Sequence, residues 1–209
     1  MARGQPVTRR SVPVGVKVAL TAFVVVLFPV YLDAYGPLHF LWLSDVALFM
    51  TVVAVWRDSR LLTSMMAVGV LPMELIWNLD FLALLLVGWS PIGLADYMLD
   101  PELSLLLRGL SLFHIPLPIL WVWLLRRWGY DRRALVGQTL LFWAVILASY
   151  LFTDPADNIN WVFSYALEPL RWMPPRAWLL AYLLGGPVVV LLPMHLILSR
   201  VADGGAGAG

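Results

Sequence analysis

The apolar segments of this chain contain side chains that can transfer protons, attack carbonyl groups or bind charged ligands. A charged side chain costs about 2.5 to 3.5 kcal/mol in the hydrocarbon of a membrane, so each one in such a segment needs a partner or a function. The residues of this kind are His39, Ser44, Asp45, Glu74, Asn78, Asp80, Arg108 and His114.

Glu74 and His114 are the main candidates for acid–base chemistry. Glu74 lies deep in its segment with no Lys or Arg at the same depth, which suits a proton donor or acceptor. We expect His114 to be the general acid or base. Glu74 or Asp45 would orient it, and Ser44 is the candidate nucleophile. The structural alternative is that His114 only bonds a carbonyl freed by a nearby proline.

Five further residues are candidates for substrate binding. Arg108 can hold an anionic headgroup, or it can join helices through a structural ion pair with Asp80 or Asp45. His39, at a helix end, is more typical of a structural or interfacial position. The five candidates are Arg108, Asn78, Asp80, His39 and Asn160.

The composition is that of a membrane protein. Of 209 residues, 61% are hydrophobic and 13% charged, and the mean hydropathy is +0.83, whereas soluble domains are about a quarter charged. The chain has no cysteine, which excludes disulfides, thiol nucleophiles and thiolate metal sites. We predict no cofactor and no metal site, because no HExxH-like spacing occurs; a metal held by His39, His114 and carboxylates is the alternative. The net charge is +1, and the basic residues are divided among several connections on one side of the membrane and do not form one patch, which indicates no nucleic-acid partner.

Six apolar stretches are long enough to cross a bilayer, so we predict an all-α, six-helix transmembrane bundle. The spans lie near 15–33, 37–56, 61–88, 103–125, 133–153 and 177–199, with a basic tail at 1–14 and a disordered tail at 200–209. The start of the chain is similar to a secretory signal. However, residues 32–35 offer no small-x-small cleavage site, which favours an uncleaved first span.

Basic and acidic connections alternate along the chain, which is the positive-inside pattern of a multi-pass cell-membrane protein. The basic connections are 57–60 and 126–133, and Arg200 follows the last span. Both termini are therefore predicted to be cytoplasmic, and the acidic connections 89–102 and 154–176 external. The second acidic connection is rich in aromatic residues and is a candidate lid on the outer leaflet.

Counting helix rise inward from the outer ends places the polar residues in two layers. The shallower layer holds Asp45, Asp80 and Arg108, and the deeper one holds Asn78, His114 and Glu74. Glu74 and Asn78 share a helix face, but Asp80 lies about 200° round from Asn78. A pocket that takes all three therefore requires the helix to break after Pro72.

Four short motifs follow one another along the chain. They are GPLHFLWLSD at 36–45, SLFHIPLPI at 111–119, DPADNINWVF at 154–163 and LLPMH at 191–195. In order and spacing they resemble the signature segments of the YwaF-like family of six-pass integral membrane proteins. The resemblance covers residues 36–199, and His39, Ser44, His114 and Asn160 match its motif positions.

A eukaryotic branch similar to that family is linked to acyl transfer on ether phospholipids, with a Cys two residues after the span-two His as the proposed nucleophile. Leu41 stands at that position here. This departure removes thioester chemistry and leaves Ser44, or a water activated by His and Glu, to take its place.

We therefore predict a membrane protein that modifies lipids, by acyl transfer or hydrolysis, from a polar site in the outer half of the bilayer. Membrane lipids are the expected partners, with a lipid or small molecule as the substrate. A transporter or small-molecule-binding protein with the same polar core is the alternative, and a non-catalytic role in membrane assembly is a third. The absence of visible inverted repeats makes alternating access the less favoured of these.

Overall fold

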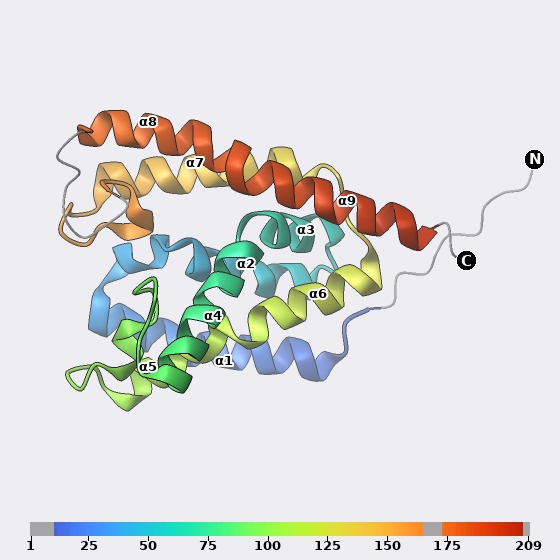
Figure 1. Ribbon diagram of the computed structural model, residues 1–209. Helices are drawn as coiled ribbons and strands as arrows, with labels where there is room; N and C mark the ends of the chain where they lie inside the picture. The colour runs from blue at the N-terminus through green and yellow to red at the C-terminus, as the bar shows by residue number, and fades with distance from the viewer. Residues whose placement is uncertain (1–10, 165–172, 207–209) are drawn as a thin grey trace, which may run out of the picture.

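The protein is a bundle in which most of the long helices lie along one axis and α4 runs obliquely to it (Figure 1). The computed structural model describes residues 11–164 and 173–206, and these contain no β-strand. The α-helices are α1 (Val14–Tyr35), α2 (Leu43–Trp56), α3 (Arg60–Gly69), α4 (Leu71–Val87), α5 (Leu105–Ser111), α6 (Pro116–Trp128), α7 (Ala134–Phe152), α8 (Pro175–Gly186) and α9 (Leu192–Ala206). The 3-10 segments are η1 (Pro37–Leu41), η2 (Asp96–Leu99), η3 (Leu112–His114) and η4 (Ile159–Trp161), and η5 (Pro187–Leu191) is a π-helix.

The predicted all-helical fold is confirmed, whereas the predicted number of spans is not reached by long helices alone. Among the described residues, four helical stretches are long and apolar enough to cross a membrane: α1, Leu105–Trp128, α7 and Pro175–Ala202. The bent pair α3–α4 makes a fifth if it is counted as one span. α2 has only 14 residues, fewer than the roughly 20 that a crossing requires.

Two predicted segments extend beyond the described residues. The basic tail at 1–14 is described only from residue 11, and the candidate lid at 154–176 is described except for 165–172. At the other terminus the sequence predicts a disordered tail from residue 200, but α9 continues as a helix to Ala206.

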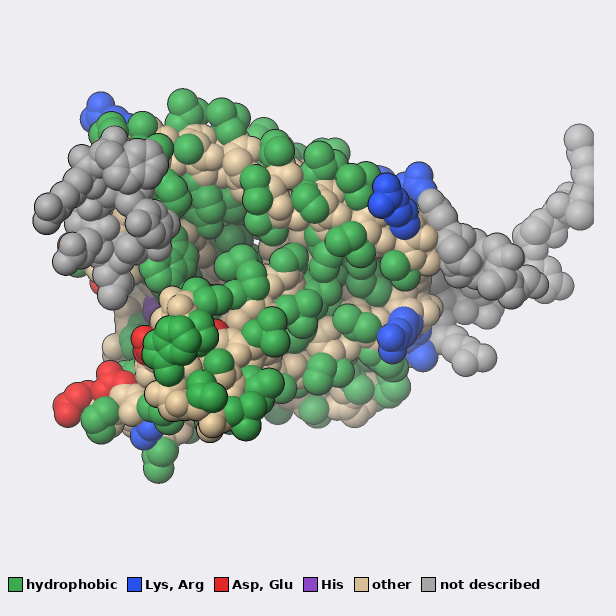
Figure 2. All heavy atoms as spheres, in the orientation of Figure 1, with side chains coloured by type: hydrophobic (Ala, Val, Ile, Leu, Met, Phe, Trp, Pro, Cys, Tyr) green, Lys and Arg blue, Asp and Glu red, His purple; other side chains and the backbone are tan. Residues whose placement is uncertain are grey.

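Charged side chains gather at the two ends of the bundle, with hydrophobic side chains between them (Figure 2). Lys and Arg lie at the end where α1 begins and α9 ends, and the α2–α3 and α6–α7 connections also reach this end (Figures 1 and 2). The acidic side chains lie mainly at the opposite end, with a few basic ones. We call these the basic end and the acidic end.

α3 fills the centre of the basic half of the bundle. It packs against α2, α6 and α7, and all of residues 63–68 are buried. Glycines allow the α3–α7 contact to be close: a Cβ on Gly69 would overlap the side chain of Gln138, and one on Gly137 would come within 2.9 Å of the Met65 sulfur.

The chain turns away from the bundle axis after α3. α4 departs from the direction of α3 by 51°, and the change occurs at Val70, just before Pro72, where the sequence predicts it just after. Proline is well tolerated in the first turn of a helix because its missing N–H has no intrahelical partner there. Because of the bend, α4 does not continue along the line of α3 beyond Gly69. Gly69 and Val70 line a cavity at that point.

A second break separates α5 from α6 at His114. Pro116 and Pro118 have no N–H to donate to the carbonyls of Leu112 and His114, four residues earlier. The Leu112 oxygen instead accepts a bond from the Ile115 amide at 3.0 Å, and the His114 oxygen accepts one from Asn78 Nδ2 at 2.7 Å. The two prolines thus place His114 at the end of a short 3-10 turn.

Candidate active site

A cavity of about 460 Å³ occupies the acidic half of the bundle, directly beyond the end of α3. It is enclosed by α1, η1, α2, α4, η3 and the loops at the acidic end. Six of the predicted site residues line it: His39, Ser44, Asp45, Glu74, His114 and Asn160. The other three, Asn78, Asp80 and Arg108, lie outside its lining.

His114 and Glu74 form a hydrogen-bonded pair in the wall of this cavity. Nδ1 of His114 lies 2.6 Å from Oε2 of Glu74, and the side chains are 13% and 2% exposed. Glu74 lies in the first turn of α4, where the partial positive charge of the helix N-terminus favours a carboxylate. With Nδ1 engaged, Nε2 is the ring nitrogen left for a ligand, which is the arrangement of a general base oriented by a carboxylate.

Two aromatic rings hold the imidazole of His114 in place. The ring centroids of Trp77 and Phe113 lie 4.5 and 4.2 Å from it, with interplanar angles of 25° and 26°. Two stacked rings do not fit on one face of an imidazole, so they cover both faces. The ring is therefore fixed in the plane of its bond to Glu74.

Asn78 supports the pair from behind and does not face the cavity. Its Nδ2 donates to the main-chain oxygens of Glu74 and His114, each at 2.7 Å. The amide thus ties α4 to the break between α5 and α6. The predicted substrate-binding role is replaced by one of positioning.

A second carboxyl group faces the same cavity from α2. Asp45 lies in the first turn of that helix and is 2% exposed. Its Oδ2 lies 3.9 Å from Nε2 of His39, beyond hydrogen-bond distance, and its Oδ1 has no hydrogen-bond partner among the described residues. His39 itself stacks on Tyr35 with ring centroids 4.2 Å apart.

Ser44 lines the cavity but lacks the contact expected of an activated nucleophile. A nucleophilic serine is normally within about 3 Å of its general base. Within the described residues, no hydrogen bond joins Ser44 to His114, whose Nδ1 is taken by Glu74. The geometry therefore supports His114 and Glu74 as a pair and gives no support to Ser44 as their third member.

Asn160 clamps the entrance of α2 to the acidic-end loop. Its Oδ1 accepts from the Leu43 amide at 2.8 Å, and its Nδ2 donates to the Leu41 oxygen at 2.7 Å and to Ser149 Oγ at 3.0 Å. These contacts engage both ends of the amide. Asn160 touches the cavity, but its side chain positions η1 and α2 and is not free to bind substrate.

Asp80 and Arg108 do not form the predicted outer layer with Asp45. Asp80 accepts bonds from Ser90 Oγ at 2.6 Å and from the amides of Ile92, Leu94 and Ala95 at 2.8 to 3.1 Å, so it shapes the loop after α4. Arg108 donates from Nη1 to the Met98 oxygen at 3.2 Å. Neither the ion pair nor the headgroup contact expected of Arg108 is supported by this position.

The cavity wall also has an aromatic part, which was not predicted from the sequence. Tyr31, Tyr35, Tyr97 and Tyr182 contribute to it together with Trp77, and the Tyr31 hydroxyl lies 2.8 Å from Ser111 Oγ. Burial raises the pKa of Tyr97 to about 12, so its phenol stays protonated. Of these aromatic residues, Trp77 could have been predicted from the sequence, because it follows Glu74 by three residues and so lies on the same helix face.

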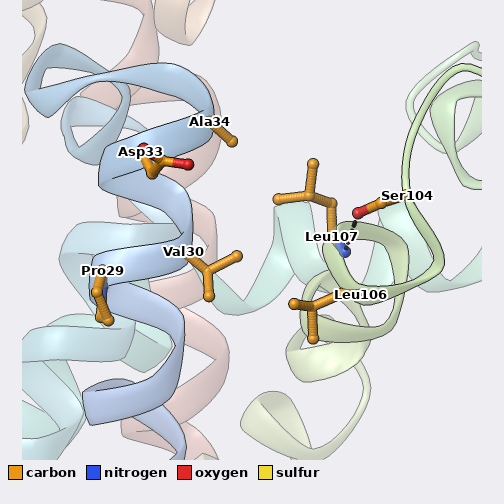
Figure 3. Close-up of a pocket in the computed structure, with 7 residues that line it drawn as sticks. All are labelled: Pro29, Val30, Asp33, Ala34, Ser104, Leu106 and Leu107. Carbon is orange, nitrogen blue, oxygen red and sulfur yellow. Dashed lines mark hydrogen bonds between the residues drawn. The ribbon is translucent and has the colours of Figure 1, made fainter.

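A separate groove of about 400 Å³ lies on the outside of the bundle, between α1 and α5 (Figure 3). Pro29, Val30 and Ala34 line one side, and Leu106 and Leu107 the other. Asp33 is its acidic residue. None of the predicted site residues lines this groove, so the cavity remains the candidate site.

Among the described residues, no group of three or more His, Asp or Glu side chains is placed to hold a metal ion. No protein-family model, curated protein or solved structure matches the chain.

Proposed function

We propose that this chain is an integral membrane enzyme that carries out acid–base chemistry on an amphiphilic lipid. The observation that carries the proposal is the 2.6 Å bond between His114 Nδ1 and Glu74 Oε2 in the wall of a cavity. A buried carboxylate that orients an imidazole is a recurrent device for proton transfer. The helices that carry and surround the pair expose large apolar side chains on the outside of the bundle. A lipid is therefore the substrate class that would be in contact with the protein.

The most consistent reaction is hydrolysis by an activated water. His114 Nε2 takes a proton from water, the resulting hydroxide adds to an ester carbonyl, and the protonated imidazole returns that proton to the departing alkoxide. The products are a carboxylic acid and an alcohol. Glu74 stabilises the imidazolium between the two steps, and no nucleophilic side chain is required.

We further propose that the chain crosses the membrane six times, with the basic end in the cytoplasm. The five residues of η1 and the 14 of α2 rise together by about 31 Å, close to the thickness of the hydrocarbon core. α3–α4 would be one bent crossing and α8–α9 another. The separation of basic from acidic side chains supports this orientation.

A binding or transport function is the second candidate, because Asp45 lines the cavity and its Oδ1 has no hydrogen-bond partner among the described residues. The position of α3 argues against alternating access. Its buried residues 63–68 fill the bundle axis between the cavity and the basic end, which favours a site that opens at the acidic end alone.

Comparative lipidomics tests the enzymatic proposal. Cells without the gene are complemented with the wild-type chain, with His114→Gln or with His195→Gln as the matched control. His195 bonds the Tyr130 hydroxyl at 2.7 Å and does not line the cavity. We expect the wild type and His195→Gln to alter one lipid class and His114→Gln to leave it unaltered. A lipid profile that is unchanged by the wild type, with uptake of a solute altered, would establish the second candidate instead.

Orientation is testable because the chain has no cysteine. Arg132→Cys at the basic end and Ala156→Cys at the acidic end each introduce one thiol at an exposed position. We expect an impermeant maleimide to label Ala156→Cys in intact cells and Arg132→Cys only after lysis. The reverse pattern would overturn the orientation.

A further inference from the structure

The charge of the cavity wall is one-sided. Asp45, Glu74 and Asp157 contribute carboxyl groups, and no Lys or Arg is among the described residues that line it. Arg108 lies three residues before the lining residue Ser111, but it donates a hydrogen bond to the Met98 carbonyl and does not line the cavity. The cavity is therefore electrostatically complementary to a cation and not to the anionic headgroup that the sequence suggests.

Asp45 is the carboxyl group without a partner. Glu74 is bonded to His114 at 2.6 Å, and Asp157 is exposed at the loop. Asp45, by contrast, is 2% exposed and its Oδ1 has no hydrogen-bond partner in the described parts of the chain. A buried acceptor without a donor destabilises the protein, and a donor on a bound ligand would remove that penalty.

Aromatic rings surround the same part of the cavity. Tyr35 stacks on His39, whose Nε2 is 3.9 Å from Asp45 Oδ2, and Tyr31 meets His39 edge-on at 5.5 Å. Trp42 and Trp161 complete the lining near η1 and η4. Aromatic faces attract ammonium groups, so the rings and the carboxylate favour the same kind of ligand.

We propose that the cavity binds the ammonium group of an amphiphile, with Asp45 as its counter-ion and hydrogen-bond acceptor and the neighbouring aromatic rings as its walls. The inference rests on the proposed function in that it assigns the substrate class of the same cavity. The ammonium belongs either to a long-chain amine that also carries an ester or to the aminoethyl phosphate headgroup of a phospholipid. In both cases the ammonium meets Asp45 while His114 Nε2 faces another part of the ligand.

A titration of the full chain in a neutral maltoside detergent tests this. Trp42, Trp77 and Trp161 line the cavity, so tryptophan fluorescence reports occupancy. Octylammonium, 1-octanol and octanoate share one chain and differ in headgroup charge, and octyl phosphoethanolamine carries the phospholipid headgroup. We expect octylammonium to bind, and octanol and octanoate to bind at least tenfold more weakly. Binding of octyl phosphoethanolamine as well assigns the phospholipid source, and its failure to bind assigns the ester of a long-chain amine.

Asp45→Asn keeps the shape of the side chain and removes its charge. We expect it to weaken octylammonium binding roughly tenfold to a hundredfold, the loss of a hydrogen bond to a charged group. Asp33→Asn is the matched control, since Asp33 is an exposed carboxyl on α1 outside the cavity, and it should bind like the wild type. If Asp45→Asn does not fold, Tyr35→Leu removes one aromatic wall and should weaken octylammonium more than octanol.

Equal binding of octylammonium and octanol, or unchanged binding by Asp45→Asn, would overturn the inference. The His114→Gln variant separates it from the proposed function, because it should bind octylammonium normally while losing the lipid change. Normal octylammonium binding by a wild type that alters no lipid refutes the enzyme and leaves the ammonium site. A lipid change without octylammonium binding refutes the ammonium site and leaves the enzyme.

Discussion

Oε2 of Glu74 lies 2.6 Å from Nδ1 of His114, although the two residues are 40 positions apart on helices that both break beside them. Removing the charge of Glu74 should therefore impair proton transfer without removing the imidazole. We expect Glu74→Gln to lower turnover about 10²- to 10⁴-fold. Glu102→Gln, at an exposed position outside the cavity, is the control. The test compares the turnover of the two purified variants, and equal rates would show that the role of Glu74 is structural.

Asn160 stabilises the fold through its side chain and its backbone conformation. It makes three hydrogen bonds at 2.7 to 3.0 Å, and its φ of 55° is in the left-handed region. Asn160→Ala should lower the free energy of unfolding by about 3 to 5 kcal/mol, from lost bonds and backbone strain.

Asn160→Gly separates these two contributions, because glycine adopts positive φ without strain. We expect it to be more stable than Asn160→Ala by about 1 kcal/mol and less stable than the wild type. Denaturant unfolding of the purified proteins measures both differences. An alanine variant as stable as the wild type would show that the clamp contributes little.

Gly69 allows α3 to approach α7 at the floor of the cavity. A Cβ there would overlap the Gln138 side chain, so Gly69→Ala should destabilise the protein by about 1 to 3 kcal/mol through overpacking. Shortening the opposing residue in the double variant Gly69→Ala, Gln138→Ala should recover part of that loss. Gly109→Ala, where no atom lies within 4 Å of the added Cβ, should be neutral or stabilising by up to about 1 kcal/mol. Independent, additive effects at positions 69 and 138 would contradict the overlap.

Asp131 predicts an acid-dependent loss of stability at the basic end. Hydrogen bonds from the Arg133 side chain hold the pKa of Asp131 at about 2, below its ordinary value of 3.8. The carboxylate therefore contributes stability above the unfolded pKa, and this contribution disappears as the pH falls through the folded pKa. We expect the melting temperature of the wild type to fall more than that of Asp131→Asn between about pH 5 and pH 2. Arg126→Gln, at an exposed position in α6, should follow the wild type, and parallel curves for wild type and Asp131→Asn would refute the assignment.

The sequence predicts the helical class and the polar groups of the cavity because a membrane makes polar residues expensive. That argument selects His114, Glu74 and Asp45 from single residues within apolar runs. It fails for Asp80, which accepts bonds from Ser90 and from loop amides, and it does not select Asn160, which is a candidate through its motif position alone. Their positions depend on turns such as the positive φ angles at Asn158 and Asn160, and no helical periodicity encodes those turns.

The extent of α2 and the aromatic lining of the cavity could not be predicted from the sequence, for a different reason. The apolar run at 37–56 reads as one helix, but its first five residues form the 3-10 segment η1, held by contacts with Asn160 from 117 or more positions away. Tyr31 and Tyr182 lie in apolar helices, where an aromatic residue in the core and one in a cavity wall have the same local sequence.

The aromatic sandwich around His114 has a stereochemical consequence. With both ring faces covered by Trp77 and Phe113 and Nδ1 held by Glu74, the imidazole does not flip, and it approaches a bound molecule from one direction. The water that it activates is therefore held at one position, in line with Nε2, and the hydroxide adds to the ester carbonyl from one face only. A base so immobile should discriminate strongly between the two enantiomers of a chiral ester.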